Sequence, residues 1–334
     1  MSPQRRRRRP RVHPRPERAV PEPPPILIPP TPSSRLRREP LARYVVLFVL
    51  TLLSTTQAGG LHYASFTTAF SDQIPRIPIL SLLLHGLWYS LSILAILGCH
   101  ELGHYYACRY YRVNSSRPYF LPLPFLLTGT LGAFIRIRTP IPGKRALFDI
   151  GIAGPIAGFL VALPVLLIGM HLSNVVKLPT SFRGDVFELG EPLLFRAAEW
   201  LTFGNIPDGY SVNIHPMAFA AWFGMLATAL NLFPIGQLDG GHISYAVFGR
   251  RSTAVTMVMV PCLIGLSFVS SSWVVWTVLT IGMLLVFGPR HPRVIDEEVP
   301  LDRSRLWLAA FALLMFVLCF TPAPIEPAAL VGRH

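Results

Sequence analysis

The stretch Gly98–Cys108, GCHELGHYYAC, holds two histidines four residues apart, with a glutamate directly after the first. It ends an apolar run that extends from residue 79 to residue 97. On a helix, residues i and i+4 lie about one turn apart on the same face, so His100 and His104 can bind one metal ion. Glu101 lies one step round the helix and can reach the open coordination position as a general base. The stretch predicts a metal site inside a membrane helix.

A His and Glu cluster with a purely structural role is the alternative to this interpretation. A charged side chain near the centre of a bilayer costs about 2.5–3.5 kcal/mol on insertion scales. Glu101 lies between two histidines in an apolar helix. The free-energy cost of placing its charge in a membrane indicates that it has a functional role.

The composition is typical of a membrane protein that crosses the bilayer several times. Of 334 residues, 51% are hydrophobic and only 14% are charged, which excludes an ordinary soluble globular protein. Four cysteines are scattered in or beside apolar segments and form no CxxC pair, so we expect reduced, packed thiols rather than disulfides.

The net charge of +13 is concentrated at one end of the chain. Residues 1–44 hold twelve arginines, and residues 1–40 hold twelve of the 33 prolines. A nucleic-acid-binding fold is therefore not implied, and we expect no nucleic acid partner. We interpret residues 1–40 as a disordered, basic, Pro-rich cytoplasmic tail that also contacts anionic lipid, and not as a cleaved signal peptide.

Apolar segments predict an all-α fold of about seven transmembrane helices, at residues 41–57, 79–111, 150–170, 215–232, 253–269, 272–287 and 306–320. We divide the chain into the tail, a first transmembrane helix and loop, a catalytic core, and C-terminal transmembrane helices, at 1–40, 41–78, 79–250 and 251–334. The basic segments between helices place the N-terminus in the cytosol and the C-terminus outside. We expect an integral protein of the bacterial inner (cell) membrane. The acidic segment 172–214 is interpreted as a long loop.

Residues 115–149 are apolar yet rich in proline and glycine, so they cannot form one continuous helix. Residues 131–138 alternate in polarity, which predicts strands or a re-entrant β-hairpin-like segment near the metal site. Such backbone is tolerated at membrane depth only where it is buried in protein or lines a wet cavity. The following helix opens with Gly151, Gly154 and Gly158, and this small-residue face predicts close helix packing.

Two histidines need a third protein ligand, and the candidates are Asp239 and Cys108. Asp239 follows Pro234 and Gly236, which must break the helix before it. Cys108 lies on the stripe of His100 and His104, but on one straight helix Cys108 would be about 12 Å from His100, too far to share an ion. We therefore prefer Asp239.

The motif HELGH at 100–104 and the pattern NLFPIGQLDGG at 231–241 together resemble the site-2 protease family of intramembrane zinc metalloproteases. The resemblance covers roughly residues 80–250 and includes GTLGAFIR at 129–136 and GIAGPIAG at 151–158. No segment is large enough for a PDZ insertion, so the chain is similar to the PDZ-less branch.

The resemblance implies a three-helix core that holds one Zn²⁺ per chain on His100, His104 and Asp239, with Glu101 as general base and acid. It further implies that Asn231 holds the substrate backbone or oxyanion. We expect substrate-binding residues in the hairpin and in the helix break: Gly129, Thr130, Leu131, Gly132, Ala133, Phe134 and Pro234.

The expected function is hydrolysis of peptide bonds within or next to transmembrane helices of substrate proteins. The expected partners are those substrates and the lipid bilayer, and the oligomeric state is open. A non-catalytic metal-dependent scaffold or a transporter is the alternative. A scaffold would need the ligands but not Glu101, and a transporter would more often show paired broken helices in two halves, which this sequence does not contain.

Overall fold

The computed structural model describes residues 39–69, 77–125, 127–178, 187–289, 291 and 294–327. The chain divides into two units, residues 1–39 and residues 40–334. All helices and strands named below belong to the second unit. The predicted basic tail lies outside the described residues apart from its last two positions.

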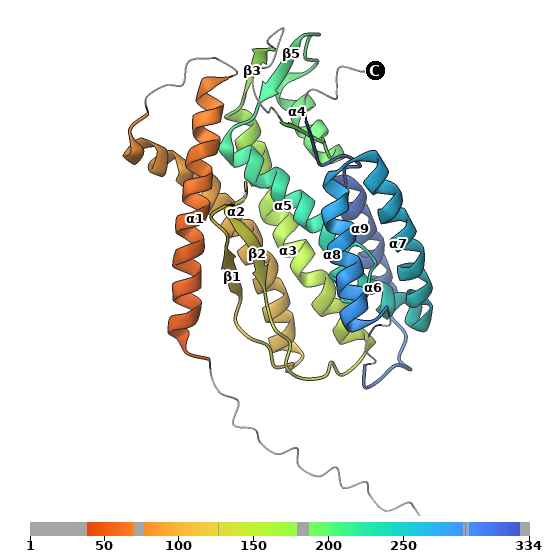
Figure 1. Ribbon diagram of the computed structural model, residues 1–334. Helices are drawn as coiled ribbons and strands as arrows, with labels where there is room; N and C mark the ends of the chain where they lie inside the picture. Colours follow the sequence, from red (N-terminus) through yellow and green to blue (C-terminus); the bar gives the residue numbers. More distant parts are fainter. Residues whose placement is uncertain are drawn as a thin grey trace, which may run out of the picture. The chain divides into compact units, whose positions relative to one another are not determined.

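Four helices, labelled in Figure 1, build the part of the bundle that carries the predicted metal motif: α1 (Leu41–Thr68), α2 (Ile79–Tyr110), α3 (Lys144–His171) and α5 (Pro216–Leu232). Their buried side chains form one apolar core, which includes Tyr89, Phe148 and Trp222. The predicted helical class is therefore confirmed, and the core contains the helix with the HELGH motif.

The first helix is longer than predicted. We expected it to end near residue 57, but α1 is 28 residues long and ends at Thr68. Gly59 and Gly60, which suggest a helix end in the sequence, are buried against α2. A Cβ on Gly59 would lie 2.4 Å from the carbonyl oxygen of Gly86. These glycines are a helix–helix contact of the kind that membrane helices favour, not a loop.

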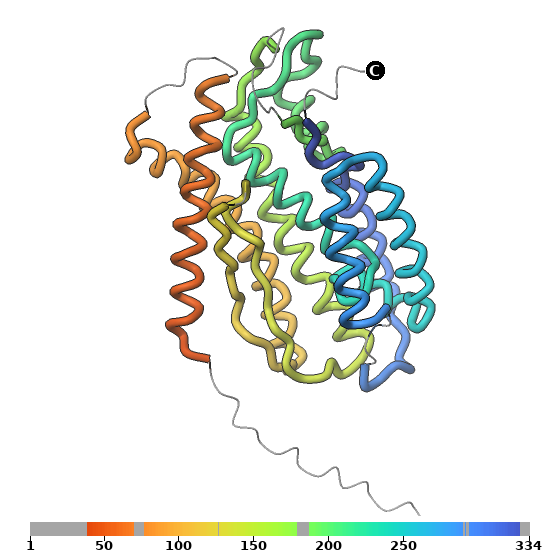
Figure 2. The backbone as a smooth tube through the Cα atoms, viewed as in Figure 1, coloured from red at the N-terminus to blue at the C-terminus, as the bar shows by residue number. Residues whose placement is uncertain are grey.

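The segment between α2 and α3 contains a β-hairpin, in the region where the alternation of residues 131–138 predicts strands, and its re-entrant position in a membrane stays a prediction. Strands β1 (Tyr119–Pro122) and β2 (Thr130–Phe134) pair antiparallel, with Tyr119 opposite Phe134 and Phe120 opposite Ala133. Figure 2 shows this hairpin running alongside α1, although the two are far apart in sequence. The strand ends at Phe134, so the predicted alternation through Arg138 is only partly strand.

The segment predicted as a long loop, 172–214, is more ordered than expected. It contains β3 (Asn174–Lys177), α4 (Leu193–Phe203) and β5 (Tyr210–Asn213), and β3 pairs with β5. A further strand, β4 (Phe187–Leu189), pairs with β6 (Ile325–Pro327). The apolar face of α4 buries Phe195 and Ala198 in the main core. Tertiary packing explains the secondary structure of this segment. Short strands that pair with distant parts of the chain leave no pattern in the local sequence.

The remaining helices are α6 (Asp239–Phe248), a short 3₁₀ turn η1 (Gly249–Arg251), α7 (Ser252–Val269), α8 (Ser272–Phe287) and α9 (Arg303–Cys319). Among the described residues, four helical segments are long and apolar enough to cross a membrane: 41–68, 79–110, 144–171 and 239–269. Helices α5, α8 and α9 have only 16 or 17 residues, about 24–26 Å of helix, against a hydrocarbon core of about 30 Å. The chain is an integral membrane protein by this measure, and the count of seven spans is not confirmed.

Candidate metal centre

Helix α2 places both histidines of the HELGH motif on one buried face. His100 and His104 are each 6% exposed, and their Nε2 atoms lie 3.1 Å apart. The apolar run that precedes them packs in the main core, so the position of this face is set by helix packing rather than by the two rings. The predicted i, i+4 arrangement is confirmed.

Asp239 reaches the same point because the chain breaks between α5 and α6. Helix α5 ends at Leu232, and α6 begins at Asp239. Gly236, inside the break, has a φ of 52°, a left-handed conformation that glycine adopts without strain. Phe233 anchors the start of the break, with its ring 5.0 Å from that of Phe316 and 5.8 Å from that of Trp273.

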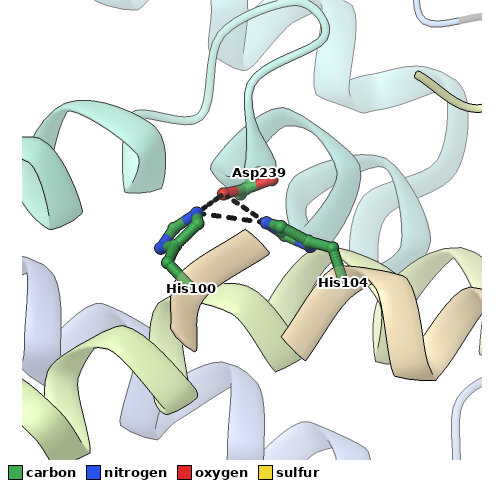
Figure 3. A group of neighbouring side chains, drawn as sticks. All are labelled: His100, His104 and Asp239. Carbon is green, nitrogen blue, oxygen red and sulfur yellow. Dashed lines mark hydrogen bonds and ion pairs between the residues drawn. The ribbon is translucent and has the colours of Figure 1, made fainter. Parts of the chain in front are cut away.

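The three donor atoms form a compact triangle (Figure 3). The Asp239 Oδ2 atom lies 3.2 Å from His100 Nε2 and 3.3 Å from His104 Nε2. Donors at about 2.0–2.1 Å from a tetrahedral zinc ion are separated by about 3.3–3.4 Å. Separations of 3.1–3.3 Å therefore fit an ion of that size and geometry, with a fourth position left for water or substrate.

Cys108, the rival candidate, lies elsewhere. It packs with Val113 and Ile150 in a separate apolar cluster. In the part of the chain that the structure describes, His100, His104 and Asp239 are the one group of three metal-binding side chains found together. The geometry supports Asp239 as the third donor.

Helix α3 orients the second histidine. The Nδ1 atom of His104 donates a hydrogen bond of 2.6 Å to the carbonyl oxygen of Ile150, which leaves Nε2 free to bind a metal. Gly154 lies directly against this ring: a Cβ there would be 2.1 Å from His104 Nε2. The small-residue face predicted at the start of α3 is confirmed, and its role is to admit the imidazole.

Glu101 and Asn231 both border the triangle of donors. Glu101 is 8% exposed, and its carboxylate accepts a hydrogen bond from the backbone N–H of Ile135, the residue just after β2. Asn231, in the last turn of α5, places its Nδ2 atom 3.4 Å from His100 Nε2. The structure therefore brings the five predicted catalytic and ligand residues together from three segments of the chain, α2, α5 and the start of α6.

The predicted substrate-binding residues are in several different environments. Leu131 and Phe134 on β2 are exposed, and Gly132 and Ala133 are half-buried. Thr130 is 1% exposed, with its hydroxyl bonded to the Leu121 carbonyl. Gly129 is in the hairpin turn, and its carbonyl accepts a hydrogen bond from Ser54. Pro234 lies in the break that carries Asp239, where its carbonyl accepts from Thr256. Internal contacts thus occupy Gly129 and Thr130.

Two groups at the site were not predicted, the N–H of Ile135 and the carbonyl of Ile150. Both are backbone groups, which a side-chain motif cannot indicate. His242 lies nearby on α6, but its ring bonds that of His291 at 2.6 Å and it is not among the three donors.

Comparison with known proteins agrees with the geometry. A profile described as peptidase family M50 matches residues 88–270. A probable zinc metalloprotease EGY2, chloroplastic, of Oryza sativa subsp. indica is 31% identical over 255 residues, 75% of this chain and 46% of that protein. A probable zinc metalloprotease EGY1, chloroplastic, of Arabidopsis thaliana is 28% identical over 315 residues, 87% of this chain and 55% of that protein.

The chain spans about half the length of these curated relatives. The matched region begins inside α2 and ends after α7, and it includes the donor triangle, Glu101 and the hairpin. The resemblance inferred from the two motifs is confirmed: the chain belongs to peptidase family M50.

Proposed function

We propose that the chain is an intramembrane zinc metalloprotease that hydrolyses peptide bonds within or beside transmembrane helices of other proteins. The observation that supports this most is the triangle of donors at 3.1–3.3 Å with a buried carboxylate beside it. These residues lie on helices long enough to cross a membrane. A scaffold or transporter has no use for a glutamate held next to the open coordination position.

In this proposal His100, His104 and Asp239 hold one zinc ion. Zinc, when bound in such a site, polarises a carbonyl and lowers the pKa of a water molecule toward about 7. The Glu101 carboxylate accepts a proton from the attacking water and then donates it to the nitrogen of the leaving amine. The Ile135 N–H holds the carboxylate in place. The Asn231 amide donates a hydrogen bond to the carbonyl oxygen of the scissile bond.

The test is cleavage by the purified chain in lipid vesicles, with a set of single transmembrane segments as reporters. We expect cleaved reporters, with fragment masses that place the cut within or beside the apolar segment, and loss of cleavage when a chelator removes the metal. Intact reporters throughout, from a folded and zinc-loaded chain, would overturn the proposal.

The edge of β2 that faces away from β1 is the surface we propose for substrate. The backbone N–H of Arg136 bonds Ser116 Oγ, its carbonyl accepts from Ser116 N–H, and Arg138 N–H bonds the Asn114 carbonyl. Because backbone groups alternate along a strand, those of Ala133 and Ile135 point away from β1. The Ile135 N–H reaches Glu101, so this edge leads to the catalytic carboxylate.

An unwound substrate segment can therefore add to β2 as a third strand next to Glu101. Addition would also satisfy backbone groups that are costly to leave unpaired in a membrane. In this proposal the hairpin is re-entrant, and water from the metal centre reaches its backbone. A hairpin that only covers the site as a flap is the alternative.

Proline at Ala133 separates these two roles, because it removes the N–H that a substrate strand would use. We expect Ala133→Pro to slow reporter cleavage by roughly tenfold, the value of one hydrogen bond of about 1–1.5 kcal/mol, with normal zinc content. Ala133→Val, which keeps the N–H, is the matched control and should cleave nearly normally. A flap would tolerate the proline but respond to Phe134→Ala, and that pattern would rule out strand addition.

The membrane and the orientation of the chain also belong to this proposal. The basic tail and loops place the N-terminus in the cytosol and the C-terminus outside a bacterial cell membrane. The relatives are named as chloroplast proteins, so they lend this location no support.

Reporter fusions test the orientation. A cytosol-active reporter should work when fused before Arg5, and an exterior-active one when fused after His334, since seven spans put the termini on opposite sides. Two termini that report the same side would mean that the number of spans is even, with the short helices α5, α8 and α9 the first to be reconsidered.

A further inference from the structure

The turn of the hairpin is held by side chains from α1 and α2. The hydroxyl of Ser54 donates to the carbonyl of Gly129 at 2.7 Å, and the hydroxyl of Tyr89 donates to the carbonyl of Thr128 at 2.9 Å. Both hydrogen bonds are buried. Nearer the surface, His62 Nε2 bonds the carbonyl of Leu127 at 2.8 Å. Three consecutive carbonyls of the turn thus each have a donor from one of these two helices, and we call Ser54, Tyr89 and His62 the turn clamp.

The backbone conformation of Gly129 and its lack of a side chain allow the turn to lie against α1. Its φ is 70°, a left-handed conformation, and a Cβ there would lie 2.6 Å from the carbonyl oxygen of Ser54. The turn therefore contacts α1 through backbone atoms. A contact of this kind has little freedom to slide, because any movement brings a carbonyl of one segment into the backbone of the other.

Helix α1 also follows the first strand of the hairpin away from the turn. The rings of Tyr44 and Tyr119 stack with centroids 4.6 Å apart, and the ring of Phe48 meets that of Phe120 edge-on at 5.3 Å. Figure 1 shows α1 alongside β1 over most of the length of the hairpin. The hairpin is therefore positioned along one whole side by α1.

The position of α1 is itself fixed by α2. A Cβ on Gly86 would lie 2.3 Å from the carbonyl oxygen of Thr56, so the two backbones are in contact. The hydroxyls of Thr55 and Ser90 form a buried hydrogen bond of 2.6 Å between the helices. Helix α2 also carries His100 and Glu101. The turn clamp and the candidate metal centre are therefore both attached to α2.

Strand β2 connects this clamp to the catalytic carboxylate. It begins at Thr130, directly after the clamped turn, and Ile135, the residue after its end, donates its N–H to Glu101. The strand is therefore held at both ends, by the turn clamp at one and by Glu101 at the other. A shift of the turn would move the Ile135 N–H away from Glu101 and the open edge of β2 away from the metal centre.

We propose that α1 is a positioning element for the reaction: through Ser54 and His62, together with Tyr89 of α2, it sets where the open edge of β2 lies relative to Glu101. The consequence for substrate rests on the proposed function, but the control of hairpin position does not. Ser54 and His62 precede residue 88, where the match to the family begins, so the family motifs assign nothing to them.

The test compares clamp variants with a matched control in the same helices. Ser54→Ala and Tyr89→Phe each remove one hydroxyl from the turn. Ser92→Ala removes a buried hydroxyl of α2 that bonds the Trp88 carbonyl of the same helix and not the hairpin. We expect about tenfold lower kcat/KM for each clamp variant and about 100-fold for the double variant, the scale of a displacement of about 1 Å. Zinc content should be unchanged in all of them, and Ser92→Ala should cleave nearly normally.

A nitroxide at the hairpin turn gives a readout that does not depend on activity. Phe125 is 94% exposed and close to the turn, so Phe125→Cys can be labelled in a chain whose four native cysteines are replaced. The label should become more mobile in Ser54→Ala and Tyr89→Phe and not in Ser92→Ala. Equal effects of all three variants, or no change in mobility and cleavage in the double variant, would overturn the inference.

His62 supplies a second test if the buried variants fold poorly, because its hydrogen bond to Leu127 is exposed. His62→Phe should loosen the label and slow cleavage, and His62→Gln, which retains an N–H donor, should restore both. Equal behaviour of His62→Phe and His62→Gln would count against the clamp. If the label loosens only in clamp variants while the wild-type chain cleaves no reporter, the positioning inference stands and the proposed function fails.

Discussion

Glu101→Gln is expected to abolish cleavage of a transmembrane reporter while the chain keeps about one zinc ion. Glutamine preserves the shape of the side chain and can still accept the hydrogen bond from the Ile135 N–H. It cannot take a proton from water. Loss of a general base costs about 10²–10⁴-fold in rate, so we expect no detectable cleavage. Glu101 is not one of the three donors, so the metal should remain.

Fragment analysis by mass spectrometry and metal analysis of the same preparation check both halves of this result. Glu298→Gln is a matched control, because Glu298 is exposed and should change neither quantity. Reporter cleavage at the normal rate by the Glu101 variant would exclude Glu101 as the base. Loss of zinc together with activity would instead make Glu101 part of the binding site.

Asp239→Ala is expected to lose most of the zinc, and Cys108→Ser almost none. Asp239 supplies the donor that closes the triangle with His100 and His104. Even outer partners of metal ligands change affinity by about 10–100-fold, so removal of a direct ligand should exceed that. Cys108 packs among apolar residues outside the triangle.

Metal content per folded chain, measured after purification with the folded state checked by circular dichroism, decides between the two ligands. The two variants control for each other, since both replace a residue that is largely buried beside α3. If Cys108→Ser lost the zinc and Asp239→Ala kept it, the site would have to be rebuilt around a kinked α2.

The sequence could predict the centre of this site because its spacing is local. His100, Glu101 and His104 need only one regular helix to reach their positions. Asp239 needed a further step: the distance along a straight helix disfavours Cys108, and Pro234 and Gly236 mark a break that can bring a distant carboxylate inward. Both steps use the geometry of single helices, which sequence patterns describe well.

Features that depend on packing between distant segments could not be predicted in this way. Gly59 and Gly60 suggest a helix end, but they are buried against Gly86 and α1 continues past them. The pairing of β4 with β6 joins residues more than a hundred positions apart. The Ile135 N–H and the Ile150 carbonyl hold Glu101 and His104, and backbone groups carry no residue-specific signal.

The packing of Phe233 makes the support of Asp239 depend on segments that are synthesised after it. Phe233 begins the break that delivers Asp239, and it rests on Trp273 of α8 and on Phe316 of α9. The ribosome makes these two partners after every donor of the metal centre. As the chain emerges from the N-terminal end, both histidines enter the membrane long before the support for the aspartate exists. Until α9 is in place, the nascent chain therefore lacks part of the aromatic packing that supports the segment carrying Asp239.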